Sequence, residues 1–312
     1  MKKLFALLLA LVMVLGTAAL AEQYTIYLVT MDLEDMHWVS VNQGAEDAVA
    51  EAKEAGVDIR YVWTGPTVGK NDAAQIECIN NAYADNADVI LLASNGPETE
   101  VATIEQYDAD GVKFVYVDSP ANSPVALCTL ATDNTEAGRM AARTLLAALE
   151  EAGVTEGKIG IVNINTSTVS TQYRENGFRE VFADTAFEIL ETQYGEGDAA
   201  KSQEIATNFI TQGVVGLFGC NEGATVGTGN AIAAEEGSTV LGVGFDKSDA
   251  ILQLVVDGKL VATTAQNPYN MGYEGIKVAV EYLTNGTTEF EDVDTGVSML
   301  TADYIKENGL LG

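Results

Sequence analysis

The sequence predicts an α/β fold made of two doubly wound parallel-sheet domains. Short apolar runs alternate with longer segments of helical spacing, and this alternation restarts after a long helical segment that ends at residue 151. The apolar runs are continuous, as in strands that are buried on both faces of a parallel sheet. At roughly 150 residues per domain, a chain of 312 residues suits two such domains.

The first half contains four strand-like runs, each followed by a helical pattern. Gly56 and Gly153 each follow a helical segment, where glycine is a common stop signal. We expect strands over 25–29, 59–63, 89–93 and 113–117, and helices over 39–55, 72–84, 98–109 and 134–151.

The second half repeats the pattern with segments of similar length. We expect strands over 159–162, 189–193, 214–218, 240–244, 260–264 and 297–300, and helices over 170–182, 199–211, 222–234, 248–257 and 269–283. No low-complexity linker separates the two halves, so short crossovers are expected to join them.

The first residues have the pattern of a secretory signal peptide. Lys2 and Lys3 precede an apolar run over 4–15, and the small-x-small site 19–21 follows it. The run is short for a membrane span, so we expect cleavage after Ala21 and export to the periplasm or the cell exterior; an uncut anchor is the alternative. Cleavage removes two lysines and takes the net charge from −30 to −32.

The charge balance excludes several classes of partner. With 46 acidic and 16 basic residues, the chain lacks the basic patches that nucleic acids and anionic membranes require. A hydrophobic content of 47 % is enough to form a core. The three cysteines, for which buried free thiols are favoured and pairing stays open, form no metal motif, so we expect neither metal nor cofactor; they are Cys78, Cys128 and Cys220.

Polar and aromatic residues recur just after the predicted strands. Ligands of open parallel sheets bind beyond the carboxyl ends of the strands. Carboxylates, amides and an arginine suit a ligand with many hydroxyls, and an aromatic ring can lie against a sugar ring. The candidates are Asp35, His37, Trp38, Asp118, Arg174, Asn221, Phe245, Asp246 and Gln266.

Structural roles compete with ligand binding at several of these positions. His37 could be a structural histidine, Asp118 and Asp246 could cap helices, and Arg174 could form a surface salt bridge. Asn221 could cap a helix and bind a ligand at once. The glycines at 223, 227 and 229 do not match the dinucleotide fingerprint, and close helix packing is the better explanation of them.

The order of these residues resembles that of the type 1 periplasmic sugar-binding proteins, and of the ribose-binding proteins in particular. The resemblance covers nearly all of the chain after residue 21. It rests most firmly on Gly244-Phe245-Asp246 and on Ala265-Gln266 after Asp257-Gly258-Lys259-Leu260, and further on Arg174 within 173–178 and on Asn221. Two weaker matches are Asp35-Met36-His37-Trp38 and Asp118-Ser119.

The resemblance implies a monomeric solute-binding protein with three hinge crossovers. They would lie near 132–133, 266–267 and 294–295, which gives domains 22–132 plus 267–294 and 133–266 plus 295–312. Closure about the hinges would trap a neutral pentose, hexose or similar polyol in the interdomain cleft and present the closed form to an ABC permease. Docking on a chemoreceptor or a sensor kinase is an alternative outcome.

The sequence departs from the family pattern at three positions. Ser119 replaces an arginine that grips ring hydroxyls in the family, and His37 replaces a phenylalanine. The stacking aromatic of the second domain would fall near Gly197, with Tyr194 as a substitute. Stretches 64–67, 118–119 and 192–195 instead resemble the autoinducer-2-binding relatives, so that ligand is the alternative.

An enzyme is the rival class of function. The chain has one histidine and lacks a nucleophile elbow, a zinc motif or a P-loop, so no catalytic constellation is assembled. Asp118 and Asp246 could imitate a glycosidase pair, yet the resembling family uses such carboxylates for binding. Cytoplasmic repressors share the fold, but the signal peptide and the missing basic head argue against that class. We therefore expect a binding protein with no catalytic residue.

Overall fold

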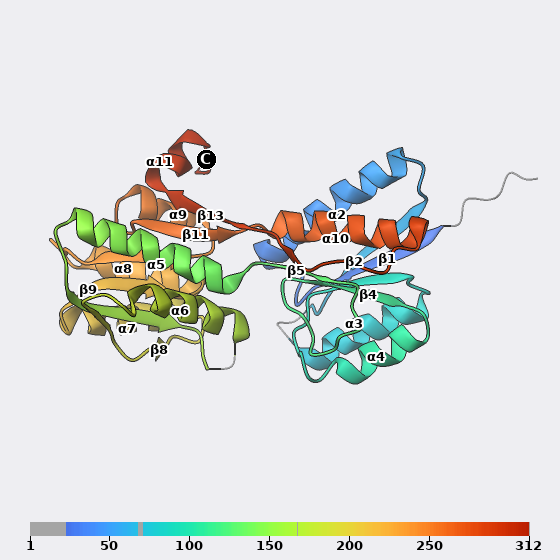
Figure 1. Cartoon of the computed structure of the whole chain (residues 1–312), viewed down its shortest axis with the longest axis horizontal. Helices are drawn as coiled ribbons and strands as arrows, with labels where there is room; N and C mark the ends of the chain where they lie inside the picture. The colour runs from blue at the N-terminus through green and yellow to red at the C-terminus, as the bar shows by residue number, and fades with distance from the viewer. Residues whose placement is uncertain (1–22, 68–70, 167, 312) are drawn as a thin grey trace, which may run out of the picture. The chain divides into compact units, whose positions relative to one another are not determined.

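The computed structural model describes residues 23–67, 71–166 and 168–311, which form two compact units (Figure 1). Unit 1 contains the described residues up to Thr129 together with Tyr269–Asp292, and unit 2 contains Leu130–Pro268 and the residues from Val293 onward. The chain therefore passes between the units three times. The predicted signal peptide lies outside the described residues, and the domain limits read from the sequence stay predictions.

Unit 1 is built on a largely parallel sheet whose strand order is β12-β5-β4-β3-β1-β2. Strand β1 lies between β2 and β3 and pairs with both in parallel, and β3 pairs in parallel with β4. The four strands predicted in the first half are confirmed to within a residue at either end. The strands are β1 (Tyr24–Val29), β2 (Ile59–Thr64), β3 (Val89–Leu92), β4 (Lys113–Val117), β5 (Thr129–Ala131) and β12 (Val293–Asp294).

Helices cover both faces of this sheet. On one face α3 (Asp72–Ala84) and α4 (Val101–Ala109) pack on a cluster that includes Tyr27, Ile90 and Phe114. The other face carries α2 (Met36–Glu54) and α10 (Pro268–Asn285), which lie side by side in Figure 1. Their backbones meet at small residues, since a Cβ on Gly44 would lie 2.0 Å from the carbonyl oxygen of Tyr269.

The sheet of unit 2 follows the order β13-β11-β10-β9-β6-β7, and β8 also pairs with β6. All its pairings are parallel except the last, because β13 runs antiparallel to β11. The strands are β6 (Gly157–Asn163), β7 (Phe187–Ile189), β8 (Gln193–Tyr194), β9 (Val214–Gly219), β10 (Leu241–Phe245), β11 (Ala262–Gln266) and β13 (Val297–Thr301).

One predicted strand of this half, 189–193, is wrong as a single element. It is divided into β7 and β8, which pair with the beginning and the end of β6. Between them the side chain of Arg179 donates hydrogen bonds to the carbonyl oxygen of Leu190, at 3.3 Å, and to the hydroxyl of Thr192, at 2.7 Å. These side-chain bonds replace strand pairing at residues 190–192.

Alternate strand residues of unit 2 face opposite layers of helices. Ile161 and Phe218 join the cluster under α5 and α6, whereas Val162 and Leu217 join the cluster under α7, α8 and α9. These helices are α5 (Asn134–Glu151), α6 (Val169–Phe182), α7 (Ala199–Thr211), α8 (Glu222–Ala234) and α9 (Asp249–Val256), and α11 (Ala302–Glu307) follows β13. Each sheet is thus covered by helices on both faces, as predicted.

The predicted close helix packing at three glycines of α8 is confirmed. A Cβ on Gly223 would lie 1.9 Å from the carbonyl oxygen of Gly197, and a Cβ on Gly227 would lie 2.5 Å from the Cβ of Ser202. A Cβ on Gly229 would meet a methyl carbon of Leu254 at 2.6 Å. Any larger residue at these positions would therefore push neighbouring elements apart.

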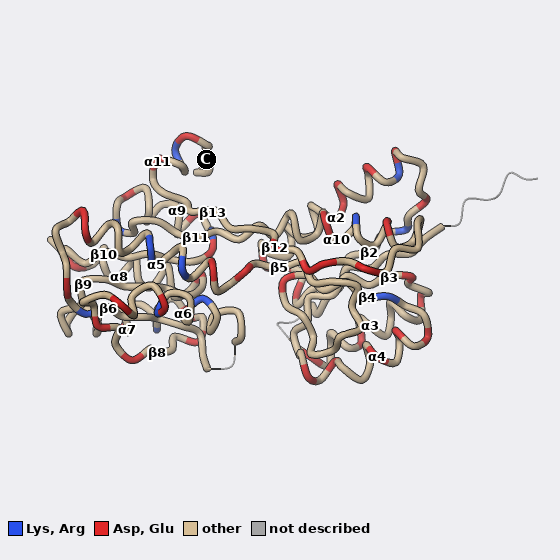
Figure 2. Tube along the Cα trace, in the orientation of Figure 1, with Lys and Arg blue, Asp and Glu red and all other residues tan. Residues whose placement is uncertain are grey.

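The cysteines and the charges agree with the sequence-based expectation. All three cysteines are free thiols; Cys128 and Cys220 are buried and Cys78 is half-buried, and burial raises the pKa of Cys128 to about 11. Figure 2 shows aspartate and glutamate spread over both units rather than gathered in one segment. Along the described ranges, no helix combines the length and the hydropathy needed to cross a membrane.

Candidate functional site

In unit 1 the first candidate, Asp35, lies at the start of α2. It caps the helix, because its carboxylate accepts a hydrogen bond from the backbone N–H of His37 at 2.9 Å. The helix consequently begins at Met36, three residues before the predicted start, since the cap satisfies a backbone donor that would otherwise be unpaired. Asp35 therefore has a structural role in addition to any contact with a ligand.

The remaining candidates of unit 1 meet near the carboxyl end of β4. Nε2 of His37 lies 3.4 Å from Oδ1 of Asp118, and the other carboxylate oxygen accepts a hydrogen bond from the hydroxyl of Ser119 at 2.7 Å. The His37 and Trp38 rings meet edge to face, with centroids 4.6 Å apart, and Trp38 is 3 % exposed. We call Asp35, His37, Trp38 and Asp118 half-site 1.

Asp118 and Asp246 occupy equivalent places in the two units and share a rare backbone conformation. Each directly follows a central parallel strand, and their φ angles are 61° and 72°. A non-glycine residue in this left-handed region is uncommon, although aspartate tolerates it better than most residues. Such strain is typical of functional positions, which makes these two carboxylates the strongest candidates on backbone grounds.

A buried glutamine, Gln75, ties together the strand ends beside half-site 1. Its side-chain amide donates to the carbonyl oxygens of Thr30 and Ala93, at 2.9 and 2.8 Å, and its oxygen accepts from the N–H of Asn95 at 2.7 Å. The ends of β1 and β3 are thereby held at a fixed separation. Sequence reasoning missed Gln75, and the available signal was an uncharged polar residue among the apolar positions of helix 72–84.

Glu100 is the most unusual acid of unit 1, because its side chain is wholly buried. Its Oε1 accepts a hydrogen bond from the N–H of Gly96 at 3.2 Å, in the loop after β3. Burial raises the pKa of Glu100 to about 7. The same loop bonds to the segment around Asp118, since the N–H of Ser94 donates to the carbonyl oxygen of Ser119 at 2.8 Å.

In unit 2 the guanidinium of Arg174 is held on several sides. It belongs to α6 and is 5 % exposed. Nε donates to Oδ1 of Asn134 at 2.8 Å, Nη1 donates to the carbonyl oxygen of Cys220 at 3.0 Å, and Nη1 lies 3.9 Å from Oδ2 of Asp246. The predicted surface salt bridge is therefore the wrong interpretation of this arginine, because its charge lies inside the unit.

Asp246 connects three of the predicted residues of unit 2. Its Oδ1 accepts a hydrogen bond from the side-chain amide of Gln266 at 2.8 Å, and its Oδ2 accepts one from the backbone N–H of Glu222 at 3.0 Å. Asn221 caps α8, since its side chain accepts from the N–H of Ala224 at 3.3 Å. We call Arg174, Asn221, Phe245, Asp246 and Gln266 half-site 2.

The aromatic candidates of unit 2 take different places. Phe245 is wholly buried, and its ring lies 3.6 Å below the Arg174 guanidinium carbon, so it supports the arginine. Tyr194 is 37 % exposed at the end of β8, and Gly197 follows it with a φ of 78°. A sugar-stacking role for Tyr194, His37 or Trp38 stays a prediction.

Two further residues of half-site 2 were missed by sequence reasoning. Asn134 accepts the hydrogen bond from Nε of Arg174, and the hydroxyl of Thr132 donates to Oε1 of Gln266 at 3.1 Å. Both flank the predicted crossing at 132–133, but nothing in their residue type indicated that they touch binding residues. Their contacts depend on α5 and α6 meeting, which periodicity does not reveal.

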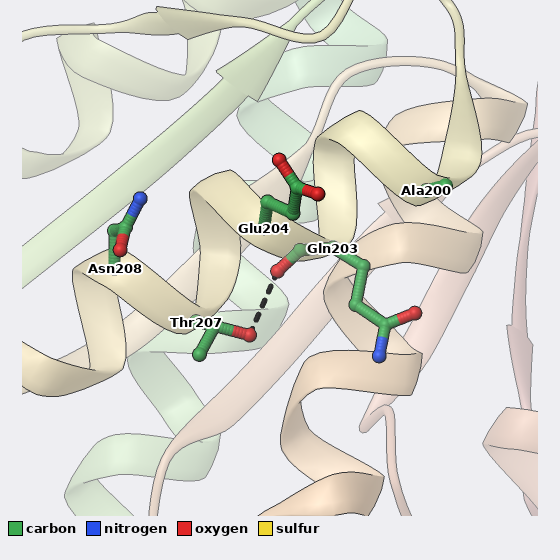
Figure 3. A pocket seen from close by; sticks show the side chains of 5 residues that line it. All are labelled: Ala200, Gln203, Glu204, Thr207 and Asn208. Atoms are coloured by element: carbon green, nitrogen blue, oxygen red, sulfur yellow. Dashed lines mark hydrogen bonds between the residues drawn. The ribbon is translucent and has the colours of Figure 1, made fainter.

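A separate hollow on unit 2 lies along one helix and contains none of the predicted site residues. Figure 3 shows its lining, all from α7, where the hydroxyl of Thr207 donates to the carbonyl oxygen of Gln203. This is the ordinary polar surface of a helix. Over the part of the chain that the structure describes, no group of three or more His, Cys, Asp or Glu residues is arranged to hold a metal ion.

Comparison with known proteins identifies the family. A family model described as "Periplasmic binding protein domain" matches residues 26–288. The chain belongs to this family. The D-allose-binding periplasmic protein of Escherichia coli is 25 % identical over 288 residues, covering 88 % of this chain and 89 % of the relative. The ribose import binding protein of Bacillus subtilis is 26 % identical over 266 residues, with coverage of 84 % and 82 %.

Solved structures of sugar-binding proteins have the same fold. A carbohydrate transporter solute binding protein from Agrobacterium radiobacter in complex with D-arabinose is 28 % identical, with a TM-score of 0.78 and coverage of 94 % of this chain and 98 % of that one. An ABC transporter solute binding protein from Agrobacterium vitis with bound D-fucose is 26 % identical, with a TM-score of 0.77 and coverage of 91 % and 98 %. The predicted type 1 periplasmic binding protein fold is confirmed.

Proposed function

We propose that this protein is an exported solute-binding protein that captures a neutral monosaccharide, or a similar polyol, and delivers it to an ABC permease. The observation that carries the proposal is half-site 2. Here residues chosen from the sequence for ligand binding, from α6 and from the carboxyl ends of β10 and β11, lie in one hydrogen-bonded group. The relatives named for ribose and allose support the sugar class.

The chemistry of the two half-sites suits sugar hydroxyls. Carboxylates such as Asp118 and Asp246 accept hydrogen bonds from hydroxyls, the amides of Asn221 and Gln266 both donate and accept, and Arg174 donates in a planar fork. Asp118 and Asp246 already accept bonds from neighbouring donors, which orients their oxygens before a ligand arrives. Preorientation lowers the entropy cost of binding.

The charges favour a neutral ligand. Half-site 1 contains Asp35 and Asp118, whereas half-site 2 pairs Arg174 with Asp246 at 3.9 Å. A sugar phosphate would bring negative charge toward carboxylates and would meet a guanidinium that already has a partner. A neutral pentose or hexose avoids this repulsion.

We propose binding without catalysis, because the carboxylates of both half-sites are engaged as hydrogen-bond acceptors in the way a binding site requires. The sugar-binding relatives also favour this ligand class over autoinducer-2. Removal of a signal peptide after Ala21, a monomeric state and hinge motion about the three crossings complete the proposal. Docking on a chemoreceptor or a sensor kinase stays a prediction.

A thermal-shift screen tests the proposed function. The chain from residue 22 onward would be melted with D-ribose, D-allose, D-arabinose, D-fucose, a sugar phosphate and an amino acid. A ligand that binds the folded state raises the melting temperature by mass action, so at least one neutral sugar should raise it and the sugar phosphate should not. A rise with the amino acid and with none of the sugars would refute the sugar class.

A further inference from the structure

We infer that Asn134 and Thr132 are positioning residues, which hold Arg174 and Gln266 in the geometry that ligand binding requires. The inference rests on the proposed function, in which Arg174 and Gln266 touch the sugar. It adds that the segment just past β5, where the chain has entered unit 2, sets the geometry of half-site 2.

Asn134 fixes the direction of the Arg174 guanidinium. The 2.8 Å bond from Nε to Asn134 and the 3.0 Å bond from Nη1 to the carbonyl oxygen of Cys220 hold two corners of a planar group. The Phe245 ring, 3.6 Å from the guanidinium carbon, fixes the plane from below. Without Asn134 the Nε corner would lose its partner, and the fork could turn about the remaining bond.

The backbone of Arg174 is held by the same helix that carries Asn134. A Cβ on Gly138 of α5 would lie 1.9 Å from the carbonyl oxygen of Arg174, and a Cβ on Gly177 of α6 would lie 1.9 Å from the carbonyl oxygen of Thr135. The two helices therefore meet backbone to backbone at these glycines. The first turns of α5 thus support both the backbone and the side chain of Arg174.

Thr132 fixes the side-chain amide of Gln266. Its hydroxyl donates to Oε1 at 3.1 Å, while Nε2 of the same amide donates to Oδ1 of Asp246 at 2.8 Å. With one partner for the oxygen and another for the nitrogen, the amide is held in one of its two orientations. Thr132 is 6 % exposed, so its hydroxyl bond is shielded from water.

The segment that carries Thr132 and Asn134 is itself anchored to the strand that returns to unit 2. The N–H groups of Asp133 and Gly296 both donate to Oδ1 of Asp294, at 3.1 and 2.9 Å, and the N–H of Thr295 donates to the carbonyl oxygen of Ala131 at 2.9 Å. A fixed segment is a suitable support for side chains that must hold others in place.

The test compares Asn134→Leu, which removes the acceptor, with Asn134→Asp, which keeps an oxygen for Nε. Thr132→Val is the second test variant, and Asn208→Leu on the exposed face of α7 is the matched control. Affinity for D-ribose, D-allose, D-arabinose and D-fucose would be measured by calorimetry. The Arg174 Nε–H signal would be followed by NMR without any sugar, together with the melting temperature.

For Asn134→Leu we expect an affinity loss of about ten- to a hundredfold, the effect of one charge-assisted hydrogen bond, and a smaller loss for Thr132→Val. Asn134→Asp should recover most of the affinity and keep the slowly exchanging Nε–H signal that Asn134→Leu loses. Wild-type affinity and an unchanged Nε–H signal in Asn134→Leu would overturn the inference, as would a lowered melting temperature with affinity intact.

The two proposals can fail separately. If the wild type binds none of the four sugars, the proposed function is refuted. The sugar-free Nε–H signal then still decides whether Asn134 holds Arg174, because it needs no ligand.

Discussion

The two half-sites differ in how strongly their residues are held together. In half-site 2, Arg174 has hydrogen bonds to Asn134 and to the carbonyl of Cys220, and Asp246 accepts from Gln266 and from a backbone N–H. In half-site 1, the recorded side-chain contacts are the 3.4 Å approach of His37 to Asp118, the Ser119 hydroxyl bond, the ring contact of Trp38 and the cap at Asp35.

This difference corresponds to how far each half-site departs from the ribose-binding pattern. Half-site 2 keeps the residues of the resembling family, and its members depend on one another. Half-site 1 carries the replacements His37 and Ser119, which have few bonds to break when they are exchanged. We interpret half-site 2 as the part that secures affinity and half-site 1 as the part that selects among sugars.

The largest expected effect comes from Asp246→Ala. The change removes a carboxylate that orients Gln266 and that we expect to accept two sugar hydroxyls, so affinity should fall about a thousandfold, or ~4 kcal/mol. Calorimetry with the sugar that binds the wild type best would measure it. The same substitution at Asp257, an exposed acid whose carboxylate accepts from Gln253 at 2.8 Å, is the matched control. Equal affinities for the two variants would contradict the site assignment.

A second, somewhat smaller effect concerns the stability of unit 1. Glu100 has a pKa of about 7 when folded and an ordinary value of 4.5, so from pH 4.5 to 7 the folded state keeps a proton that the unfolded state has lost. The stability that this proton supplies is present below pH 4.5 and is lost as the pH rises to about 7. Glu100→Gln should therefore gain on the order of 3 kcal/mol over the wild type between pH 5 and 8.

Urea unfolding followed by tryptophan fluorescence would measure this gain. Both tryptophans of the chain, Trp38 and Trp63, lie in unit 1, so the signal reports on the unit that contains Glu100. Glu54→Gln, at the exposed end of α2, controls for the loss of one charge. A difference between Glu100→Gln and wild type that stays constant with pH would show that burial does not hold the proton on Glu100.

The smallest effect expected is a change of selectivity from Ser119→Arg. In the resembling family an arginine at this position grips ring hydroxyls, so restoring it should change the ratio of affinities for two sugars, such as D-ribose and D-fucose, by about tenfold. Ser298→Arg, on the exposed face of β13 in unit 2, is the control for added charge. If Ser119→Arg alters both affinities equally, selection does not lie in half-site 1.

Much of the fold could be predicted because its signals are local. Continuous apolar runs located the main strands of both sheets, and the helices 72–84, 134–151, 199–211 and 222–234 have the predicted bounds. The divided strand at 189–193 could not be foreseen, since its interruption depends on Arg179, which lies on a different element. The antiparallel direction of β13 is likewise a matter of tertiary pairing.

The site could be predicted as a set of positions but not as a set of contacts. The rule that ligands bind beyond the strand ends, with the family pattern, selected Asp246 and Gln266, which the structure joins by a hydrogen bond. Asn134, Thr132 and Gln75 were missed, because each acts through a partner at least 18 residues away, as in the bond from Gln75 to Ala93. Spacing along the chain carries no signal for such long-range bonds.

The left-handed backbone at Asp118 and Asp246 has a consequence for engineering this protein. Glycine adopts that conformation without the steric cost that aspartate bears, which is on the order of 1 kcal/mol. At both positions the residue that best suits the backbone is thus the one that lacks a carboxylate. A directed-evolution campaign scored only on heat tolerance should therefore keep codons 118 and 246 unchanged.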